Sequence, residues 1–164
     1  MKTLFLICLS FFSFQLSAQQ NTQIQRAHFS LTHPASWTID KTDPDYDPDG
    51  LFTLQSPDST SMVMFILLNV FVENSVMLEA QIKEFKSQLI RETTSETPFT
   101  TWGALKGNGI ILRGKLMGVL PGAVRIFTWN NKEKSMVIIE QYFDEGFENI
   151  KNDYKLIESS FKFL

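Results

Sequence analysis

Four aspartates alternate with other residues in the stretch DPDYDPDG, residues 43–50. Asp45, Asp47 and Asp49, with the glycine that follows, match the first half of a D-x-[DN]-x-[DN]-G calcium loop, in which carboxylates converge on one cation. That loop needs a bidentate Glu at its twelfth position, where this chain has Ser56, and flanking helices, where the chain has strand-like WTID and LFTL. A solvated turn is the competing reading, because Asp, Pro and Gly favour turns for backbone reasons alone. We expect the turn, and keep calcium binding at the three aspartates as the alternative.

Two glycine-containing stretches resemble nucleotide-binding motifs only in part. Residues 109–116, GIILRGKL, have the glycine and lysine spacing of a P-loop, but Leu116 stands where a Ser or Thr would hold magnesium. The pair Gly107 and Gly109 lacks the third glycine of a dinucleotide site, because position 112 is Leu. We therefore expect neither kind of nucleotide site.

The two histidines, His28 and His33, are five residues apart on a predicted strand. This odd spacing places their side chains on opposite faces, so they cannot share a metal while the strand is regular. The chain also has no G-x-S-x-G nucleophile motif. Without a complete catalytic set, we expect a protein that is not an enzyme and that uses no cofactor, calcium excepted.

The first residues have the pattern of an export signal. Lys2 gives a positive start, Leu4 to Phe14 form an apolar run, and Ala18 stands at the expected cleavage point. The run is shorter than the ~20 apolar residues of a membrane-spanning helix. We expect residues 1–18 to be a signal peptide and the mature protein to be periplasmic or secreted, with no integral membrane segment. Cys8, the only cysteine, lies inside this signal, which leaves no thiol for a disulfide or a metal.

Length and charge restrict the function further. The chain has 164 residues, enough for one domain after the signal. Its net charge is −3, and no block of Lys and Arg interrupts the sequence. Because binding to phosphate backbones needs clustered basic side chains, we do not expect a nucleic-acid partner.

The region after the signal begins with a polar segment and continues with strands. Residues 19–27 are expected to be a short, mobile lead-in to a single domain over residues 28–164. Alternation of apolar and polar residues predicts strands in HFSLT, WTIDK and GLFTLQS. Met62–Leu68 are apolar at every position, which is typical of a central strand covered on both faces.

Two helices are predicted, one in the middle of the chain and one near its end. The first begins at Asn74 or Ser75 and ends in the region Thr93–Pro98; its apolar stripe is Leu78, Ile82, Phe85 and Leu89. The second has a stripe with the same period, formed by Phe147, Ile150, Tyr154, Ile157 and Phe161. Each stripe must be buried against another element.

Between these helices, turn residues separate three β-rich stretches, GIILRGKLMG, GAVRIFTW and SMVIIEQYF. Such short connections predict a meander of antiparallel strands. Antiparallel strands with helices on the faces belong to the α+β class. We therefore predict an antiparallel β-sheet sandwiched between two helices.

Several segments resemble the PsbP/Mog superfamily across residues 28–163. FSLTHPASWTI, with Phe29, Pro34 and Trp37, is similar to the opening of that fold; GLFTLQSP and LIESSFKF are similar to its second strand pair and its last helix-to-strand segment. The resemblance implies an α/β/α sandwich and a non-enzymatic role, as in photosystem accessory proteins, a nuclear import factor that binds a small GTPase, and exported bacterial proteins. It supplies no catalytic or metal-binding residue for this chain.

The aromatic residues, including Trp37 and Trp129, are expected mainly in the core. The glycine-rich hairpins between Trp102 and Gly122 are the predicted rim for a partner or a small apolar ligand, with Trp102, Asn108 and Arg113 as its residues. The predicted function is an exported accessory module of the cell envelope that binds a protein partner or a small ligand. The alternative is a calcium-responsive module that uses the acidic turn.

Overall fold

The computed structural model describes residues 20–88 and 90–164. The predicted signal peptide, Cys8 and Leu89 of the first helical stripe lie outside the described residues. In chain order the elements are β1 (Asn21–Gln25), β2 (Phe29–Pro34), β3 (Thr38–Asp40), β4 (Leu51–Gln55), β5 (Met62–Leu68), α1 (Asn74–Gln88), β6 (Ile90–Trp102), β7 (Leu105–Leu116), β8 (Leu120–Asn130), β9 (Ser135–Phe143), α2 (Phe147–Ser160) and β10 (Lys162–Phe163).

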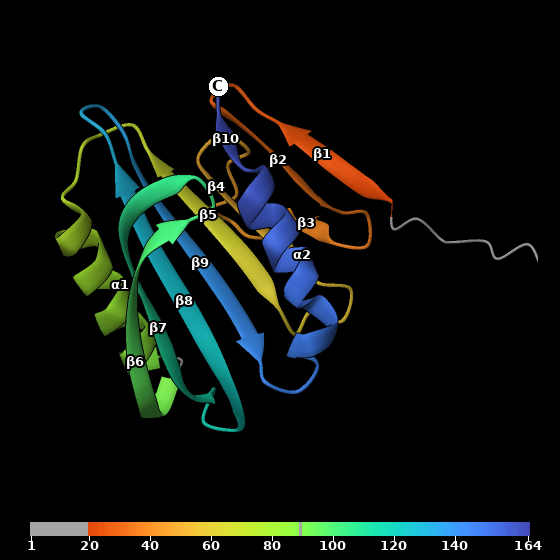
Figure 1. Cartoon of the computed structure of the whole chain (residues 1–164), viewed down its shortest axis with the longest axis vertical. Helices are drawn as coiled ribbons and strands as arrows, with labels where there is room; N and C mark the ends of the chain where they lie inside the picture. The colour runs from red at the N-terminus through yellow and green to blue at the C-terminus, as the bar shows by residue number, and fades with distance from the viewer. Residues whose placement is uncertain (1–19, 89) are drawn as a thin grey trace, which may run out of the picture.

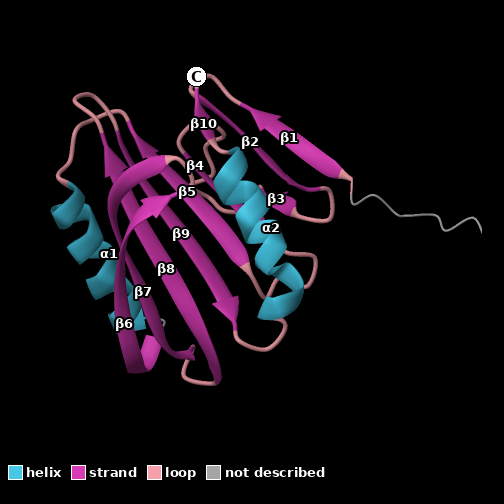
Figure 2. Ribbon diagram, viewed as in Figure 1, coloured by secondary structure: helices cyan, strands magenta, loops and turns pink. Residues whose placement is uncertain are grey.

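Seven strands form one antiparallel sheet in the order β3-β4-β5-β9-β8-β7-β6, and β1, β2 and β10 form a smaller sheet (Figure 1). Strands β7, β8 and β9 are consecutive neighbours, which confirms the predicted meander. Figure 2 shows the large sheet between the two helices. Helix α1 packs on β6, β7 and β8, and α2 packs on β2 on the other side. This arrangement is the predicted α+β sandwich.

Two apolar cores lie on the two faces of the large sheet. Side chains of a strand alternate between faces, and in β9 Met136 and Ile138 join the core on the α2 side, whereas Val137 and Ile139 join the core on the α1 side. Strand β5 alternates in the same way, as its continuous apolar run predicts. Phe65 of β5 is fully buried in the α2-side core.

Both helices are held by the stripes that the sequence shows. In α1, Leu78, Ile82 and Phe85 pack on the α1-side core. In α2, Tyr154 and Ile157 are buried in the opposite core. Within residues 20–88 and 90–164, neither helix has the length and unbroken apolar character that crossing a membrane requires.

Two segments correct the sequence prediction. Residues 21–25, part of the expected mobile lead-in, form β1. This polar edge strand is held by its backbone pairing with β2 and by burial of Ile24, its one buried side chain. The stretch Thr93–Pro98, expected only to end the first helix, lies inside the thirteen-residue strand β6. Pro98 is tolerated there because β6 is the edge of the large sheet, where a missing N–H costs no ladder bond.

We expect the Phe65→Ala variant to lose roughly 3–5 kcal/mol of unfolding free energy, because removing a fully buried ring leaves a cavity. Phe65 stacks on Phe52 and Phe161, at centroid separations of 4.8 and 5.8 Å. The control is Phe71→Ala, since Phe71 is 46% exposed and a surface substitution changes stability by only about 0.5 kcal/mol. Urea unfolding of both variants measures the difference; equal losses would contradict the assigned core.

Candidate functional site

The acidic turn between β3 and β4 is held by hydrogen bonds from its backbone N–H groups to its own carboxylates. Asp43 accepts a hydrogen bond from the backbone N–H of Asp45 at 2.9 Å, and Asp47 accepts one from the N–H of Asp49 at 3.0 Å. Asp49 in turn accepts a hydrogen bond from the N–H of Ala27 at 3.3 Å. In the described part of the chain, no group of three His, Cys, Asp or Glu side chains is arranged to hold a metal ion. Calcium binding at this turn stays a prediction.

The three residues predicted for a ligand rim have separate surroundings. Trp102 ends β6 and is buried, with its indole N–H donating to Glu140 at 2.8 Å. Asn108 lies on β7, where its carbonyl accepts from a threonine hydroxyl of β8. Arg113, five residues further along β7, pairs with Asp144 at 2.8 Å on the protein surface.

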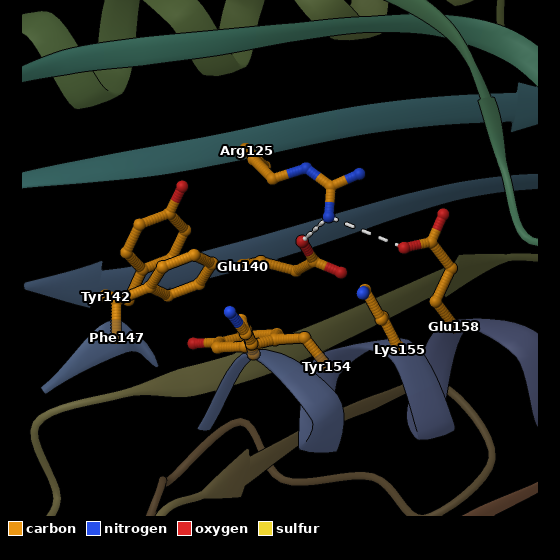
Figure 3. Close-up of a pocket in the computed structure, with 8 residues that line it drawn as sticks. Arg125, Glu140, Tyr142, Phe147, Tyr154, Lys155 and Glu158 are labelled. Atoms are coloured by element: carbon orange, nitrogen blue, oxygen red, sulfur yellow. Dashed lines mark hydrogen bonds and ion pairs between the residues drawn. The ribbon is translucent and has the colours of Figure 1, made fainter. Parts of the chain in front are cut away.

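The first candidate site, which we call the arginine pocket, is a cavity of about 230 Å³ between the large sheet and α2 (Figure 3). It is lined by Arg125, Glu140, Tyr142, Phe147, Lys151, Tyr154, Lys155 and Glu158. Arg125 on β8 is directly opposite Glu140 on β9 in the antiparallel register, so both side chains leave the sheet on the same face. Helix α2 supplies the facing wall.

A network of ion pairs forms the floor of the arginine pocket. Nη1 of Arg125 lies 2.5 Å from Oε2 of Glu140 and 3.5 Å from Oε2 of Glu158. The other oxygen of each carboxylate is also used: Glu140 accepts from the indole of Trp102, and Glu158 accepts from the backbone N–H of Gly103 at 2.9 Å. The network thus ties the end of β6 to β8, β9 and α2.

Glu140 is the buried acid of this network, with a side chain that is 2% exposed. Burial, the largest effect, raises the pKa of Glu140 to about 7, against the opposing effects of Arg125 and Trp102. Raised pKa values also occur in structural ion-pair networks. Both oxygens of Glu140 accept a hydrogen bond, one from Trp102 and one from Arg125, so the network holds the carboxyl group in one orientation.

Aromatic rings form the rest of the arginine pocket. Tyr142 and Phe147 stack with their centroids 4.0 Å apart, and Tyr154 meets Tyr142 edge-on at 5.8 Å. The Tyr154 hydroxyl donates to the carbonyl of Gln141 at 2.6 Å, which fixes the ring against β9. These contacts hold the aromatic wall in place without a ligand.

The second candidate site is an open groove of about 580 Å³ on the opposite face of the sheet, which we call the methionine groove. Its lining residues are Ser59, Met62, Met64, Ile66, Gln81, Glu84, Phe85, Met117, Ile139 and Gln141. The groove exists because α1 packs mainly on β6, β7 and β8, so Met62, Met64 and Ile66 on this face of β5 are only half-buried and the predicted cover on both faces of β5 is incomplete. Strand β9 contributes to both sites by alternation, with Ile139 and Gln141 on the groove side and Glu140 and Tyr142 on the pocket side.

Sequence reasoning missed both sites, although one signal for the arginine pocket was present. The stretches GAVRIFTW and SMVIIEQYF each carry one charge in an apolar run. The short connection between them sets a register in which Arg125 faces Glu140. The methionine groove has no comparable signal, since it depends on which strands α1 leaves uncovered.

The raised pKa of Glu140 should make the free energy of unfolding depend on pH. Because the pKa of Glu140 is about 7 in the folded state and ordinarily 4.5, the folded state binds this proton more tightly between those values. The contribution of Glu140 to stability is therefore complete below pH 4.5 and is lost as the pH rises through 7. We expect the stability advantage of wild type over Glu140→Gln to fall by an amount on the order of 1–3 kcal/mol across that interval.

The control is Glu133→Gln, which removes an exposed carboxyl from the β8–β9 turn. Its unfolding free energy, measured by urea denaturation at each pH, should follow the wild-type profile. If the Glu140→Gln profile also runs parallel to wild type, the proposed protonation of the buried carboxyl is wrong.

Comparison with known proteins gives a match in structure but not in sequence. No protein-family model matches the chain, and no curated protein matches its sequence. The cyanobacterial PsbP protein (CyanoP) of Synechocystis sp. PCC 6803 is similar in structure, with a TM-score of 0.55 and 8% identity over 92% of this chain and 96% of that one. LpqN of Mycobacterium tuberculosis, described as involved in cell envelope biogenesis, has a TM-score of 0.54 and 13% identity over 88% and 90% of the two chains.

The Ran-binding protein Mog1p of Saccharomyces cerevisiae is also similar, with a TM-score of 0.54 and 8% identity over 88% of this chain and 96% of Mog1p. At these identities the likeness concerns the fold. This likeness in fold agrees with the α/β/α sandwich that the resemblance in sequence implies. The chain has the PsbP/Mog1-like fold.

Proposed function

We propose that this protein is an exported, non-enzymatic binding module of the cell envelope, which holds a small apolar ligand in the methionine groove. The observation that carries the proposal is the groove itself. Its volume of about 580 Å³ falls within the roughly 300–1,000 Å³ of small-molecule sites, and its walls are mainly apolar with a few polar groups.

The side chains of the groove suit a flexible apolar molecule. Met62, Met64 and Met117 line it together, and methionine adapts its shape to irregular ligands because it is unbranched and polarizable. Met117 stands in the β7–β8 turn with a φ of 54°, an uncommon conformation for a residue with a side chain. Such strain is found at ligand clamps. Gln81 and Gln141 offer amide groups to a polar end of the ligand.

Export and an envelope role rest on the sequence and on the fold. Lys2, the apolar run Leu4–Phe14 and Ala18 have the order of a signal peptide. Among the proteins of similar structure, LpqN is involved in cell envelope biogenesis and Mog1p binds Ran, so the fold is compatible with binding in different cellular settings.

The apolar dye N-phenyl-1-naphthylamine tests the groove, because its fluorescence rises in apolar surroundings. We expect a saturable rise with wild type and an affinity at least about tenfold lower with Met64→Glu, since the variant places an unpaired carboxylate in the site. Val76→Glu is the matched control: Val76 is 58% exposed on α1 and does not line the groove. No saturable rise, or equal losses in both variants, would refute groove binding.

A protein partner is the second candidate, favoured by apolar side chains exposed at the β7–β8 turn. Met117, Val119 and Leu120 are 64%, 70% and 44% exposed. Neighbouring exposed apolar residues are typical of interaction surfaces. Such a partner would contact the mouth of the methionine groove, because Met117 belongs to both.

Affinity purification from the native envelope tests this candidate. We expect a partner to co-purify with the wild-type chain and to be lost from Val119→Asp/Leu120→Asp, because two carboxylates oppose burial of the turn. Recovery of the bare chain under gentle conditions would contradict a protein partner. Mass spectrometry of the same material reads the mature N-terminus, and an uncleaved Met1 would contradict export through a signal peptide.

A further inference from the structure

The ion pairs of the arginine pocket use only part of the hydrogen-bond donors of Arg125. Both oxygens of each carboxylate accept a hydrogen bond, those of Glu140 from Trp102 and Arg125, and those of Glu158 from Gly103 and Arg125. Arg125 makes these two ion pairs through Nη1 alone. The Arg125 side chain is 22% exposed, and one face of its guanidinium lies over the Phe99 ring, with Cζ 5.1 Å from the ring centroid. Within residues 20–88 and 90–164, its other nitrogens are not among the buried polar atoms that lack a partner.

Lys155 adds another positive charge to the pocket, so that Arg125 and Lys155 together face the carboxylates of Glu140 and Glu158. It is an exposed residue of α2 that lines the pocket, and in Figure 3 its side chain extends toward Glu140 and Glu158. No ion pair joins Lys155 to a residue in the described part of the chain, whereas the neighbouring Lys151 pairs with Glu148. A ligand that accepts hydrogen bonds and carries negative charge would meet Lys155 and the N–H groups of Arg125 that the ion pairs do not use.

The aromatic wall of the pocket determines which uncharged group such a ligand can carry. Tyr142, Phe147 and Tyr154 present aromatic surface, and rings prefer to stack or meet edge-on with other rings. The cavity of about 230 Å³ is smaller than the roughly 300–1,000 Å³ of sites for drug-sized molecules. The ligand is therefore small, about the size of one ring with one charged substituent.

We propose that the arginine pocket binds a small carboxylate that carries an aromatic ring, with the carboxylate on Lys155 and Arg125 and the ring against Phe147 and Tyr142. This site is separate from the methionine groove, because it lies on the other face of the sheet. It does not depend on the proposed apolar ligand. The salt bridge of Arg125 with Glu140 then serves to hold the guanidinium in place for the ligand.

Titration with benzoate, followed by NMR chemical shifts of the purified protein, tests the proposal. We expect benzoate to bind saturably. Three related compounds should bind more weakly: benzamide because it is uncharged, acetate because it has no ring, and benzylamine because its charge is positive. Lys155→Gln should weaken benzoate binding roughly five-fold, the effect of one partly exposed ion pair. Lys132→Gln, an equal loss of charge in the β8–β9 turn, should leave the affinity unchanged.

A second variant tests the aromatic wall. Phe147→Leu keeps an apolar side chain but removes the ring, so benzoate affinity should fall while the weak binding of acetate stays the same. The proposal is overturned if benzoate shows no saturable shifts in wild type. It is also overturned if benzamide or benzylamine binds as tightly as benzoate, or if Lys132→Gln weakens benzoate as much as Lys155→Gln. Saturable shifts confined to the methionine groove would overturn it as well.

Discussion

The structure depends on one constraint, which is that the central strands are apolar on both faces. Phe65 and Ile138 need cover on one side of the sheet, while Val137 and Ile139 need it on the other. A single helix cannot satisfy both demands, so two helices, separated in sequence by strands β6 to β9, pack on opposite faces. The hydrophobic effect supplies the driving force at roughly 25 cal/mol for each Å² of apolar surface buried. The two candidate sites lie where this cover is incomplete or interrupted.

The ion pair of Arg125 and Glu140 lies among apolar residues, where desolvation of its charges costs free energy. Removing Glu140 and Arg125 from water opposes folding, and replacing a buried pair by apolar residues is often neutral or stabilising in other proteins. Here the pair also satisfies the indole of Trp102 and, through Glu158, connects α2 to the turn after β6. An apolar pair could not make those connections. The network therefore specifies how the edge strand and α2 are placed, in addition to any contribution to stability.

The fold could be predicted from local patterns, and the failures have local causes. The stripes of α1 and α2 and the turns between β7, β8 and β9 predict the correct elements because each element is amphipathic or bounded by turn residues. Strand β1 has one buried side chain and β6 contains Pro98, so neither has a strand signal of its own. Their conformation comes from pairing with β2 and β7, which is a tertiary effect. Propensity within a short window cannot include it.

The sites were harder to predict than the fold because they depend on residues that neighbour each other only in space. The register of β8 and β9 could have paired Arg125 with Glu140, but Glu158 and Trp102 reach the same point from a helix and from an edge strand. Attention to the acidic turn found residues of suggestive type, yet their carboxylates hold the turn itself. Residue type and spacing therefore locate turns better than they locate cavities.

Strand β9 links the two candidate sites through its alternation. Ile139 and Gln141 line the methionine groove, and Glu140 and Tyr142, their immediate neighbours, line the arginine pocket. Because successive side chains point to opposite faces, each site can change its chemistry by substitution at every second position without altering the other. A shift of β9 along its neighbours by one residue would exchange the two sets and place Glu140 and Tyr142 on the groove side. The register of one strand thus maintains two separate chemical environments in a single sheet.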